Sequence, residues 1–537
     1  MPPGCDVYAA LRGRVRMRPD RSAAQLRGCA REAGPCIIRR FRVPEMNTPA
    51  PLATSSSGTS SALLTDLYQL TMAYGYWKSG RGDQEAAFHA FFRRNPFAGG
   101  FTLAAGLADA VAYLQDFHFT QDDLKYLGSL LGRDGKSLFD PAFLDYLGVL
   151  RFTCDVQAVP EGTVLFPQEP WLRVQGPILQ GQLVESALLN FLNFQSLIAT
   201  KAARVCLAAQ GDPVIEFGLR RAQGINGAIT ASRAACIGGC AGTSNVLAGK
   251  LFGAPVKGTH AHSWVMSFDD ELTAFEAYAA AMPNNCIFLV DTYDTLQGVR
   301  HAVTVGKRLR EQGHEMAGIR LDSGDLAYLS IQARKILDDA GFPEAVLVAS
   351  NDLDEHLIAS LKQQNAAIDI WGVGTRLVTA YDQPALGGVY KLTALRQPNG
   401  TWTHKLKLSE QTAKVTTPGI LQIRRFRSAT EFIGDALYNE VGGRPGEFTI
   451  VDPVDATRRK HFGSETPSED LLVPVLRGGE LVNALPEVKA IRARAQQQLS
   501  MLHPGIKRFE NPHQYPAGLE LGLHELKTRL ILSARHS

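Results

Sequence analysis

Aspartates that recur at a regular interval are the first sign of chemistry in this sequence. Asp291, Asp322 and Asp352 follow one another at intervals of 31 and 30 residues, and each closes an apolar run of strand length. That interval is the length of one β-α unit. Carboxylates repeated in this way are not needed for stability, and Asp322, helped by Asp291, could hold Mg²⁺. The alternative is that the neighbouring Ser323 or Asp325 simply caps the helix that follows.

Glycines follow another apolar run, in the segment Gly372-Val-Gly-Thr-Arg376. Without side chains there, backbone N–H groups can turn toward an anion, and the threonine hydroxyl adds a donor. A lone G-x-G is also typical of a plain tight turn. The second glycine pair, in Gly387-Gly-Val-Tyr-Lys391, adds a cation and favours phosphate binding. The expected phosphate-binding positions are Gly372, Gly374, Thr375, Gly387 and Gly388.

An aromatic ring lies beside two arginines in Glu216-Phe-Gly-Leu-Arg-Arg221. Phe217 could stack on a small aromatic acid whose anionic group faces Arg220. Taken alone, the same residues describe a core phenylalanine and two surface arginines.

Two histidines stand two residues apart in Gly258-Thr-His-Ala-His-Ser263. If a strand continues through them, they share a face and could chelate a metal, but no third ligand is apparent. A single reactive imidazole, nucleophilic toward phosphorus, is the favoured interpretation.

A repeated alternation of strands and helices must position these residues. Apolar runs end in polar or glycine clusters, and helix-length stretches with 3.6-residue spacing lie between them. Such runs imply a parallel sheet that is buried on both faces and binds ligands at the carboxyl ends of its strands. The expected strands are residues 213–217, 254–261, 286–291, 317–322, 345–352 and 368–375, with helices at 296–312 and 327–340. Earlier in the chain, residues 63–76 are expected to be helical and residues 85–92 to form a strand.

Composition and charge are those of an ordinary enzyme. Hydrophobic residues make up 45% and charged residues 20% of the 537 residues, and the net charge of +3 is too small to indicate nucleic acid or an anionic membrane. The longest apolar stretch, residues 185–210, contains Asn190, Asn193 and Lys201, and so predicts a buried helix rather than a membrane span. Eight cysteines without zinc spacing favour structural thiols in a reducing, cytoplasmic compartment.

From about residue 62 onward the chain resembles nicotinate phosphoribosyltransferases, of the branch shared by animals and many bacteria. The resemblance depends on the joint occurrence and order of several motifs, none of which is decisive alone. These are Leu64-Thr-Asp-Leu-Tyr-Gln69, Glu216-Phe-Gly-Leu-Arg-Arg221, Gly242-Thr-Ser-Asn-Val-Leu-Ala-Gly249, Gly258-Thr-x-Ala-His-Ser263, Val290-Asp-Thr-Tyr-Asp-Thr295, Arg320-Leu-Asp-Ser-Gly-Asp-Leu326, Gly372-Val-Gly-Thr375 and Leu386-Gly-Gly-Val-Tyr-Lys391.

The resemblance implies an α/β fold: an irregular α/β barrel of the type II phosphoribosyltransferase kind with a smaller mixed α+β domain before it. It also implies a head-to-tail homodimer that shares its active sites, with Tyr68 of one subunit and Phe217 of the other on either side of the pyridine ring. It places Arg220 and Arg320 near the base and the sugar diphosphate. Further ligand contacts are implied for Thr259, Asp352 and Thr375, with Thr375 at the 5-phosphate.

The implied reaction joins nicotinate to 5-phosphoribosyl 1-diphosphate, with Mg²⁺ as cofactor and ATP as co-substrate. His262 matches the histidine that ATP phosphorylates in this family. Related nicotinamide enzymes carry Asp where this chain has Ser244, and an aspartate would repel a carboxylate. Nicotinate is therefore expected over nicotinamide. The alternatives are a nicotinamide enzyme and, from another class, a non-catalytic phosphate-binding barrel that would lack His262, Asp322 or Arg320.

Four regions are expected along the chain. Residues 1–61 would be a disordered extension and residues 62–180 a mixed α+β domain. Residues 181–395 would form the barrel, and residues 396–537 a C-terminal region that partly returns to the N-terminal domain. Neither nucleic acid nor a membrane is expected as a partner.

Overall fold

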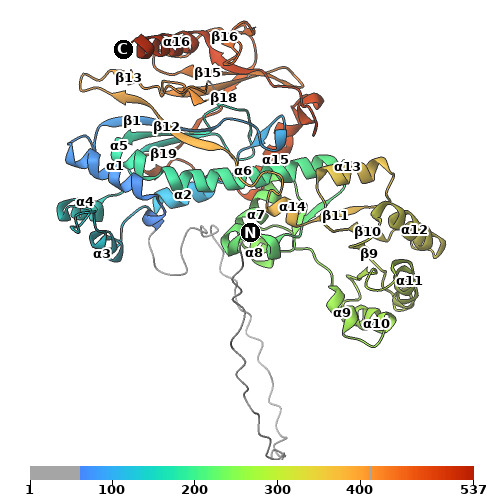
Figure 1. The fold of residues 1–537 in the computed structure, drawn as a ribbon. Helices are drawn as coiled ribbons and strands as arrows, with labels where there is room; N and C mark the ends of the chain where they lie inside the picture. Colours follow the sequence, from blue (N-terminus) through green and yellow to red (C-terminus); the bar gives the residue numbers. More distant parts are fainter. Residues whose placement is uncertain (1–60, 412–413, 537) are drawn as a thin grey trace, which may run out of the picture. The chain divides into compact units, whose positions relative to one another are not determined.

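The computed structural model describes residues 61–411 and 414–536 (Figure 1). The extension expected at residues 1–61 lies outside this range except for Ser61. The described strands form two six-stranded sheets, a seven-stranded sheet and a strand pair. Within the described residues, no helix is long and apolar enough to cross a membrane.

The seven-stranded sheet combines early and late parts of the chain. Its strand order is β13-β12-β1-β5-β3-β19-β20, and every pairing in it is antiparallel. The strands are β1 (Glu85–Phe92), β3 (Asp155–Ala158), β5 (Leu172–Pro177), β12 (Gly388–Arg396), β13 (Trp402–His404), β19 (Val473–Arg477) and β20 (Glu480–Leu481). The expected strand at 85–92 is confirmed as β1, and the expected first helix is α1 (Leu67–Lys78). Because β12 and β19 join this sheet, segments that follow the parallel sheet in sequence pack beside the N-terminal strands.

The parallel sheet confirms the predicted β-α repeat. Its order is β7-β6-β11-β10-β9-β8, and all pairings are parallel. The strands are β6 (Val214–Glu216), β7 (Gly242–Thr243), β8 (Ile287–Leu289), β9 (Gly318–Leu321), β10 (Val346–Ala349) and β11 (Ile370–Val373). Three connecting helices, α11 (Thr295–Glu311), α12 (Leu326–Asp339) and α13 (Glu355–Gln363), each begin at an aspartate side chain that accepts a backbone N–H. Asp325 is one of these caps, so the capping interpretation is correct for Asp325 and leaves Asp322 free for another role.

The expected strand at 254–261 was wrong. Only Val256 pairs with the sheet, through an isolated parallel bridge to Thr243. Pro255 lacks a backbone N–H, and the segment leaves β7 after Lys257 N donates to Thr243 O at 3.0 Å. It then reaches the opposite edge, where Leu289 N of β8 donates to Nε2 of His260 at 3.2 Å. This segment thus connects the two edge strands, which do not pair with each other among the described residues.

Helix α6 (Glu185–Ala208) is the buried helix expected at 185–210. It packs against α7 (Gly224–Gly238) beside the parallel sheet, and against α2 (Leu107–Gln115) and β12 on the side of the seven-stranded sheet. Lys201, which argued against a membrane span, is fully buried in ion pairs with Glu355 and Asp382. α6 therefore links the parallel sheet to the N-terminal part of the chain.

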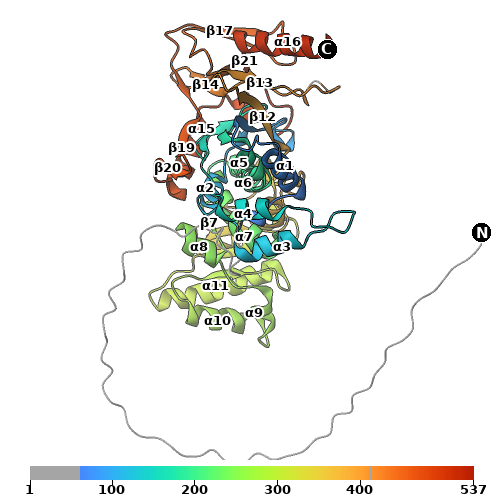
Figure 2. The same cartoon turned by 90° about the vertical axis from the view of Figure 1, so that its left-hand side faces the viewer.

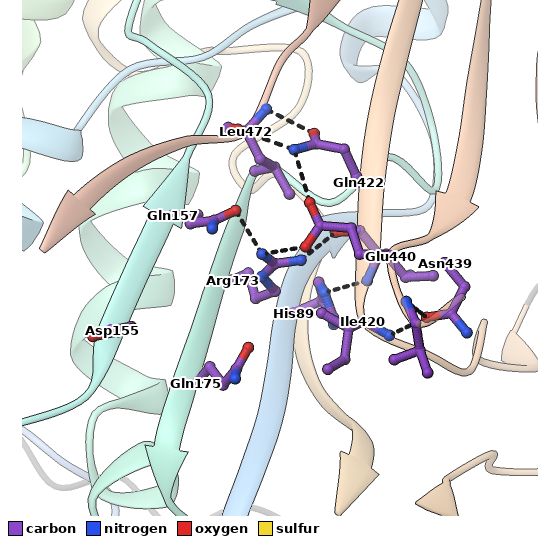
Figure 3. Close-up of polar contacts among 12 residues, drawn as sticks. His89, Asp155, Gln157, Arg173, Gln175, Ile420, Gln422, Asn439, Glu440 and Leu472 are labelled. Atoms are coloured by element: carbon purple, nitrogen blue, oxygen red, sulfur yellow. Dashed lines mark hydrogen bonds and ion pairs between the residues drawn. The ribbon is translucent and has the colours of Figure 1, made fainter. Parts of the chain in front are cut away.

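The C-terminal sheet packs against the seven-stranded sheet through polar contacts (Figure 3). Buried Arg173 of β5 donates to Leu421 O at 3.2 Å and to Gln157 Oε1 at 2.6 Å, and pairs with Glu440 at 2.8 Å. Leu421 N donates to Nε2 of buried His89 at 3.1 Å. The C-terminal sheet consists of β14 (Leu421–Arg427), β15 (Phe432–Asn439), β16 (Phe448–Val451), β17 (Arg459–Phe462), β18 (Ser468–Asp470) and β21 (Ala517–Glu520). Helix α16 (Leu521–His536) packs on β15, β16 and β21 of this sheet (Figure 1 and Figure 2).

Candidate functional site

Two aspartates meet where β8 and β9 end. Oδ2 of Asp291 accepts from Asp322 N at 2.9 Å and from the Ser323 hydroxyl at 2.5 Å. The other oxygen, Oδ1, is buried and has no hydrogen-bond partner among the described residues. Asp322 in turn accepts a hydrogen bond from the hydroxyl of Ser350, which follows β10. The predicted pairing of these carboxylates at one edge is therefore present, and one carboxylate oxygen is left without a protein donor.

Arg320 places a cation beside the two carboxylates. Its Nη1 donates to Thr259 Oγ1 at 2.7 Å, whereas its buried Nε has no partner in the described chain. Burial lowers the pKa of Arg320, Asp322 and Asp291 oppose that shift, and Arg220 adds to it. Arg220 is exposed and follows the carboxyl end of β6, which belongs to the same parallel sheet as β9. The site thus combines two arginines with two aspartates.

His262 lies at the start of α9 (His262–Met266), next to the aspartates. Its Nδ1 is 3.1 Å from Thr292 Oγ1, and its Nε2 is 3.7 Å from Asp322 Oδ2. The side chain is 38% exposed, so a ligand can reach the ring. A hydroxyl on one nitrogen and a carboxylate near the other orient the ring, which suits a nucleophilic imidazole.

His260 points away from this cluster. Its ring packs against Phe275 and Tyr278, and Nε2 accepts the N–H of Leu289. Burial lowers its pKa to about 4, so the ring is neutral at physiological pH. Within the described residues, no group of three or more His, Cys, Asp or Glu side chains could hold a metal. The two histidines therefore lie in different surroundings.

Phe217 follows β6 and lies over β11. A Cβ built on Gly372 would be 2.6 Å from Cε2 and 2.7 Å from Cδ2 of the Phe217 ring, so the ring lies directly against this glycine. The backbone is fixed as well, because Phe217 N donates to Val373 O at 2.8 Å. A Cβ built on Gly374 would lie 3.1 Å from the carbonyl oxygen of Phe217, so this glycine also lies close to residue 217. The partly exposed ring thus rests on the strand through its Cδ2 and Cε2 atoms.

A buried carboxylate that the sequence did not single out organises the neighbouring loops. Glu216 is fully buried and accepts hydrogen bonds from Gly218 N, from the Ser232 hydroxyl at 2.8 Å and from the Thr243 hydroxyl at 2.5 Å. Ser244 N donates to the Glu216 carbonyl at 2.9 Å. A glutamate inside the apolar run before Phe217 was the available signal. Through these bonds Glu216 fixes the loops that carry Phe217 and Ser244.

The predicted phosphate-binding segment, residues 372–375, runs from the end of β11 to the first residue of α14 (Thr375–Val378). Within α14, Arg376 pairs with Asp354 at 3.0 Å. Fully buried Glu355, the first residue of α13, pairs with Lys201 at 2.7 Å and with Arg204 at 2.7 Å. Asp352 is exposed and has a φ of 43°, in the left-handed region. Its backbone is therefore held in a conformation that non-glycine residues seldom adopt.

Three predicted residues lie away from the parallel sheet. Tyr68 is on α1 and is 50% exposed. Partial burial raises its pKa, and the charges of Glu185 and Asp66 raise it further. Gly388 begins β12, and a Cβ built on it would collide with Oδ1 of Asn193. A Cβ built on Gly387 would meet no atom within 4 Å. Among the described residues, no hydrogen bond or ion pair joins these three positions to Asp291, Asp322 or Phe217.

Comparisons with known proteins fit this arrangement. Three family models cover consecutive segments: the nicotinate phosphoribosyltransferase N-terminal domain over residues 63–193, the nicotinate phosphoribosyltransferase family over 213–406 and its C-terminal domain over 422–527. A nicotinate phosphoribosyltransferase of Bacillus subtilis is 44% identical, over 88% of this chain and 97% of that protein. This chain belongs to the nicotinate phosphoribosyltransferase family. The family resemblance seen in the sequence is thereby confirmed.

Solved structures of similar proteins agree in fold. The structure of human nicotinic acid phosphoribosyltransferase matches with a TM-score of 0.76 and 35% identity, over 87% of this chain and 99% of that chain. A nicotinate-nucleotide pyrophosphorylase of Pyrococcus furiosus matches with a TM-score of 0.60 and 21% identity, over 86% of this chain and 98% of that chain, which concerns the fold alone. The mixed α/β fold expected from the sequence is confirmed at this level.

Proposed function

We propose that this member of the family joins nicotinate to the ribose of 5-phosphoribosyl 1-diphosphate, forming nicotinate mononucleotide and diphosphate. The single observation that carries the proposal is the convergence of Arg320, Asp291, Asp322 and His262 at one strand edge. The residues whose loss would mark a non-catalytic barrel are all present. We further propose that the parallel sheet and the segment around His260 form the irregular barrel of type II phosphoribosyltransferases.

Charge stabilisation is the main task of the protein in this reaction. As the bond from C1 of ribose to diphosphate breaks, the sugar gains oxocarbenium character and the leaving group gains negative charge. Arg320 would stabilise that charge, with its orphaned Nε available as a donor. The pyridine nitrogen is already nucleophilic, so no general base is needed. Phe217 and Arg220 would orient nicotinate by stacking and by pairing with its carboxylate.

The pair Asp291 and Asp322 fits Mg²⁺. The ion commonly takes one or two carboxylates together with substrate oxygens, and the unpartnered Oδ1 of Asp291 is a suitable ligand. When bound, the ion would neutralise diphosphate charge. On the opposite side of the sugar, Asp352 and the glycines at 372 and 374 would contact the ribose and phosphate, with Thr375 at the 5-phosphate.

His262 is proposed to accept the γ-phosphoryl group of ATP on one ring nitrogen. The imidazole nitrogen attacks phosphorus, the bond to the bridging oxygen breaks, and ADP leaves with the electron pair. Thr292 and Asp322 hold the ring for this attack. Hydrolysis of the phosphohistidine would then be coupled to transfer of the ribosyl phosphate to the base.

A second copy of the chain is proposed to complete the site. Leu67 and Tyr68 at the start of α1 are half-exposed, as is Leu64 just before the helix. At the start of α7 and of α8 (Val246–Phe252), which follow Phe217 in the chain, Ile225 and Val246 are 78% and 70% exposed. Large apolar side chains on both surfaces suit a head-to-tail homodimer. Tyr68 of one copy would then cover the open face of the Phe217 ring in the other, with Gly387 and Gly388 beside it.

The assay is mononucleotide formation with Mg²⁺, with and without ATP, using nicotinate and nicotinamide in parallel. We expect product from nicotinate that rises with ATP, and a preference over nicotinamide because Ser244 carries no charge to repel a carboxylate. His262→Ala should abolish the ATP stimulation. His314→Ala is the matched control, because this partly exposed histidine contacts Asn284 rather than the aspartates. Turnover of nicotinamide alone would refute the specificity, and no turnover of either base would refute the activity.

Mixing two inactive variants tests the shared site. Tyr68→Ala and Phe217→Ala remove the two proposed halves of the base sandwich. After unfolding and refolding together, half of the dimers should contain one of each, and each of these should hold one intact site. Activity should therefore return to about a quarter of the wild-type value if sites are shared. No recovery above the sum of the separate variants would contradict the shared site.

A further inference from the structure

A cavity of about 440 Å³ lies apart from the parallel sheet. Its walls come from the segment after β1, from residues 166–168 and from the C-terminal sheet with α16. No residue of β6 to β11 lines it. Its volume is in the range of small-molecule sites, which are usually about 300–1,000 Å³. The proposed reaction makes no use of this space.

Basic side chains line the cavity without counter-charges. Arg93, Arg94 and Lys527 all lie in its wall. Arg93 Nε is buried and has no hydrogen-bond partner among the described residues, and neither arginine forms an ion pair there. Lys527 Nζ has a hydroxyl for a partner, Thr417 Oγ1 at 3.2 Å, rather than a carboxylate. Burial lowers the pKa of Lys527 to about 8, as expected for an ammonium group without an anion.

Two acidic groups near the cavity, Asp452 and Asp435, are already engaged. Asp452, the carboxylate in the cavity wall, accepts from Val454 N at 2.8 Å and from Asp455 N at 3.0 Å. Its other oxygen is 3.8 Å from an Arg458 nitrogen. Behind Tyr515, Asp435 is paired with Arg425 at 2.6 Å. The wall therefore has an excess of positive charge that no described side chain neutralises.

We propose that this cavity is a second anion site, which binds a small molecule through a phosphate group. Two guanidinium groups and an ammonium group match the several oxygens and the nearly two negative charges of a phosphate at neutral pH. A carboxylate carries a single charge and would leave the cavity positive. Pro167, Pro453 and Pro512 supply rigid apolar walls for the rest of the ligand.

Trace acetylation of lysines tests the proposal on the full-length protein. The labelling rate of Lys527 is measured by mass spectrometry with increasing inorganic phosphate, and exposed Lys489 serves as an internal reference. We expect phosphate to slow labelling of Lys527 about fivefold or more at saturation, because the bound anion holds the amine protonated and covered. Potassium chloride at matched ionic strength controls for screening. Equal slowing by chloride, or none by phosphate, would overturn the proposal.

Variants separate this cavity from the catalytic site. Arg94→Gln should raise about tenfold the phosphate concentration that gives half-maximal protection of Lys527 from acetylation, as expected for loss of one charge-assisted contact. Arg529→Gln is the matched control, since it removes the same charge from an exposed position on the helix that carries Lys527. Arg320→Gln should leave protection of Lys527 unchanged although it impairs catalysis. Protection that survives Arg94→Gln unaltered, or disappears in Arg320→Gln, would refute a separate site.

Discussion

Gly372 is expected to be sensitive to substitution, because it leaves room for the Phe217 ring. In Gly372→Ala the new Cβ would lie 2.6 Å and 2.7 Å from two ring carbons. To restore the 3.4 Å at which ordinary contact begins, the ring must move by about 0.8 Å. The backbone bond from Phe217 N to Val373 O prevents the whole residue from moving back, so the ring itself must tilt into the space for the base.

A displacement of this size should reduce catalysis strongly. Misplacement of a positioning group by roughly 1 Å can cost about 100-fold in rate, so we expect kcat/KM for nicotinate to fall by about that factor, or about 2.7 kcal/mol. KM for the sugar diphosphate should change less than KM for nicotinate, because the new Cβ meets the Phe217 ring, whereas only the backbone of residue 372 is proposed to face the phosphate. The fold should persist, since Phe217 is partly exposed and its ring can leave the strand.

Steady-state kinetics with both substrates varied measure this effect. Gly446→Ala is the matched control, because this exposed glycine has no atom within 4 Å of its Cβ position. The decisive comparison is Gly372→Ala in a Phe217→Ala background, where the alanine has no ring to displace and should cost nothing further. A full 100-fold additional loss in that background, or wild-type kcat/KM in the single variant, would refute the reasoning.

Three other predictions concern buried polar groups. Glu216→Gln replaces one acceptor oxygen with an amide NH2 that faces hydroxyl donors, so urea unfolding should show a loss of about 1–3 kcal/mol. Selection of nicotinate over nicotinamide should weaken as well, and unchanged selectivity would contradict a positioning role. Glu355→Gln leaves Lys201 and Arg204 with less counter-charge and should lower the unfolding free energy by about 3 kcal/mol, whereas a loss below about 0.5 kcal/mol would contradict this. Burial, aided by Arg173, holds the pKa of His89 well below 6.5, so the unfolded chain binds a proton that the native protein does not. Stability should fall as pH drops below 6.5, by up to about 1.4 kcal/mol per pH unit, and His89→Gln should flatten this dependence; equal pH slopes in both proteins would contradict it.

Local patterns in the sequence were sufficient for much of the parallel sheet. The strands at β8, β9, β10 and β11 and helices α11 and α12 fall inside or within a residue of the predicted ranges, because continuous apolar runs and 3.6-residue spacing report burial directly. The same reasoning failed at 254–261, where the apolar composition near Pro255 predicts a strand and the structure has only an isolated bridge at Val256. That segment instead crosses between the two sheet edges, and a crossing of this kind has no periodic signature.

The sequence by itself determined that carboxylates, an arginine and glycines follow successive strands, and that the ordered motifs are those of one family. Which atoms meet was decided by the tertiary structure. The surroundings of His260 and His262 differ, because one ring faces the aromatic core and the other faces Asp322. Glu216 gained its role because hydroxyls from α7 and β7 converge on it in the interior. The basic cavity unites residues more than 400 positions apart, a proximity that only long-range packing creates and that no local pattern encodes.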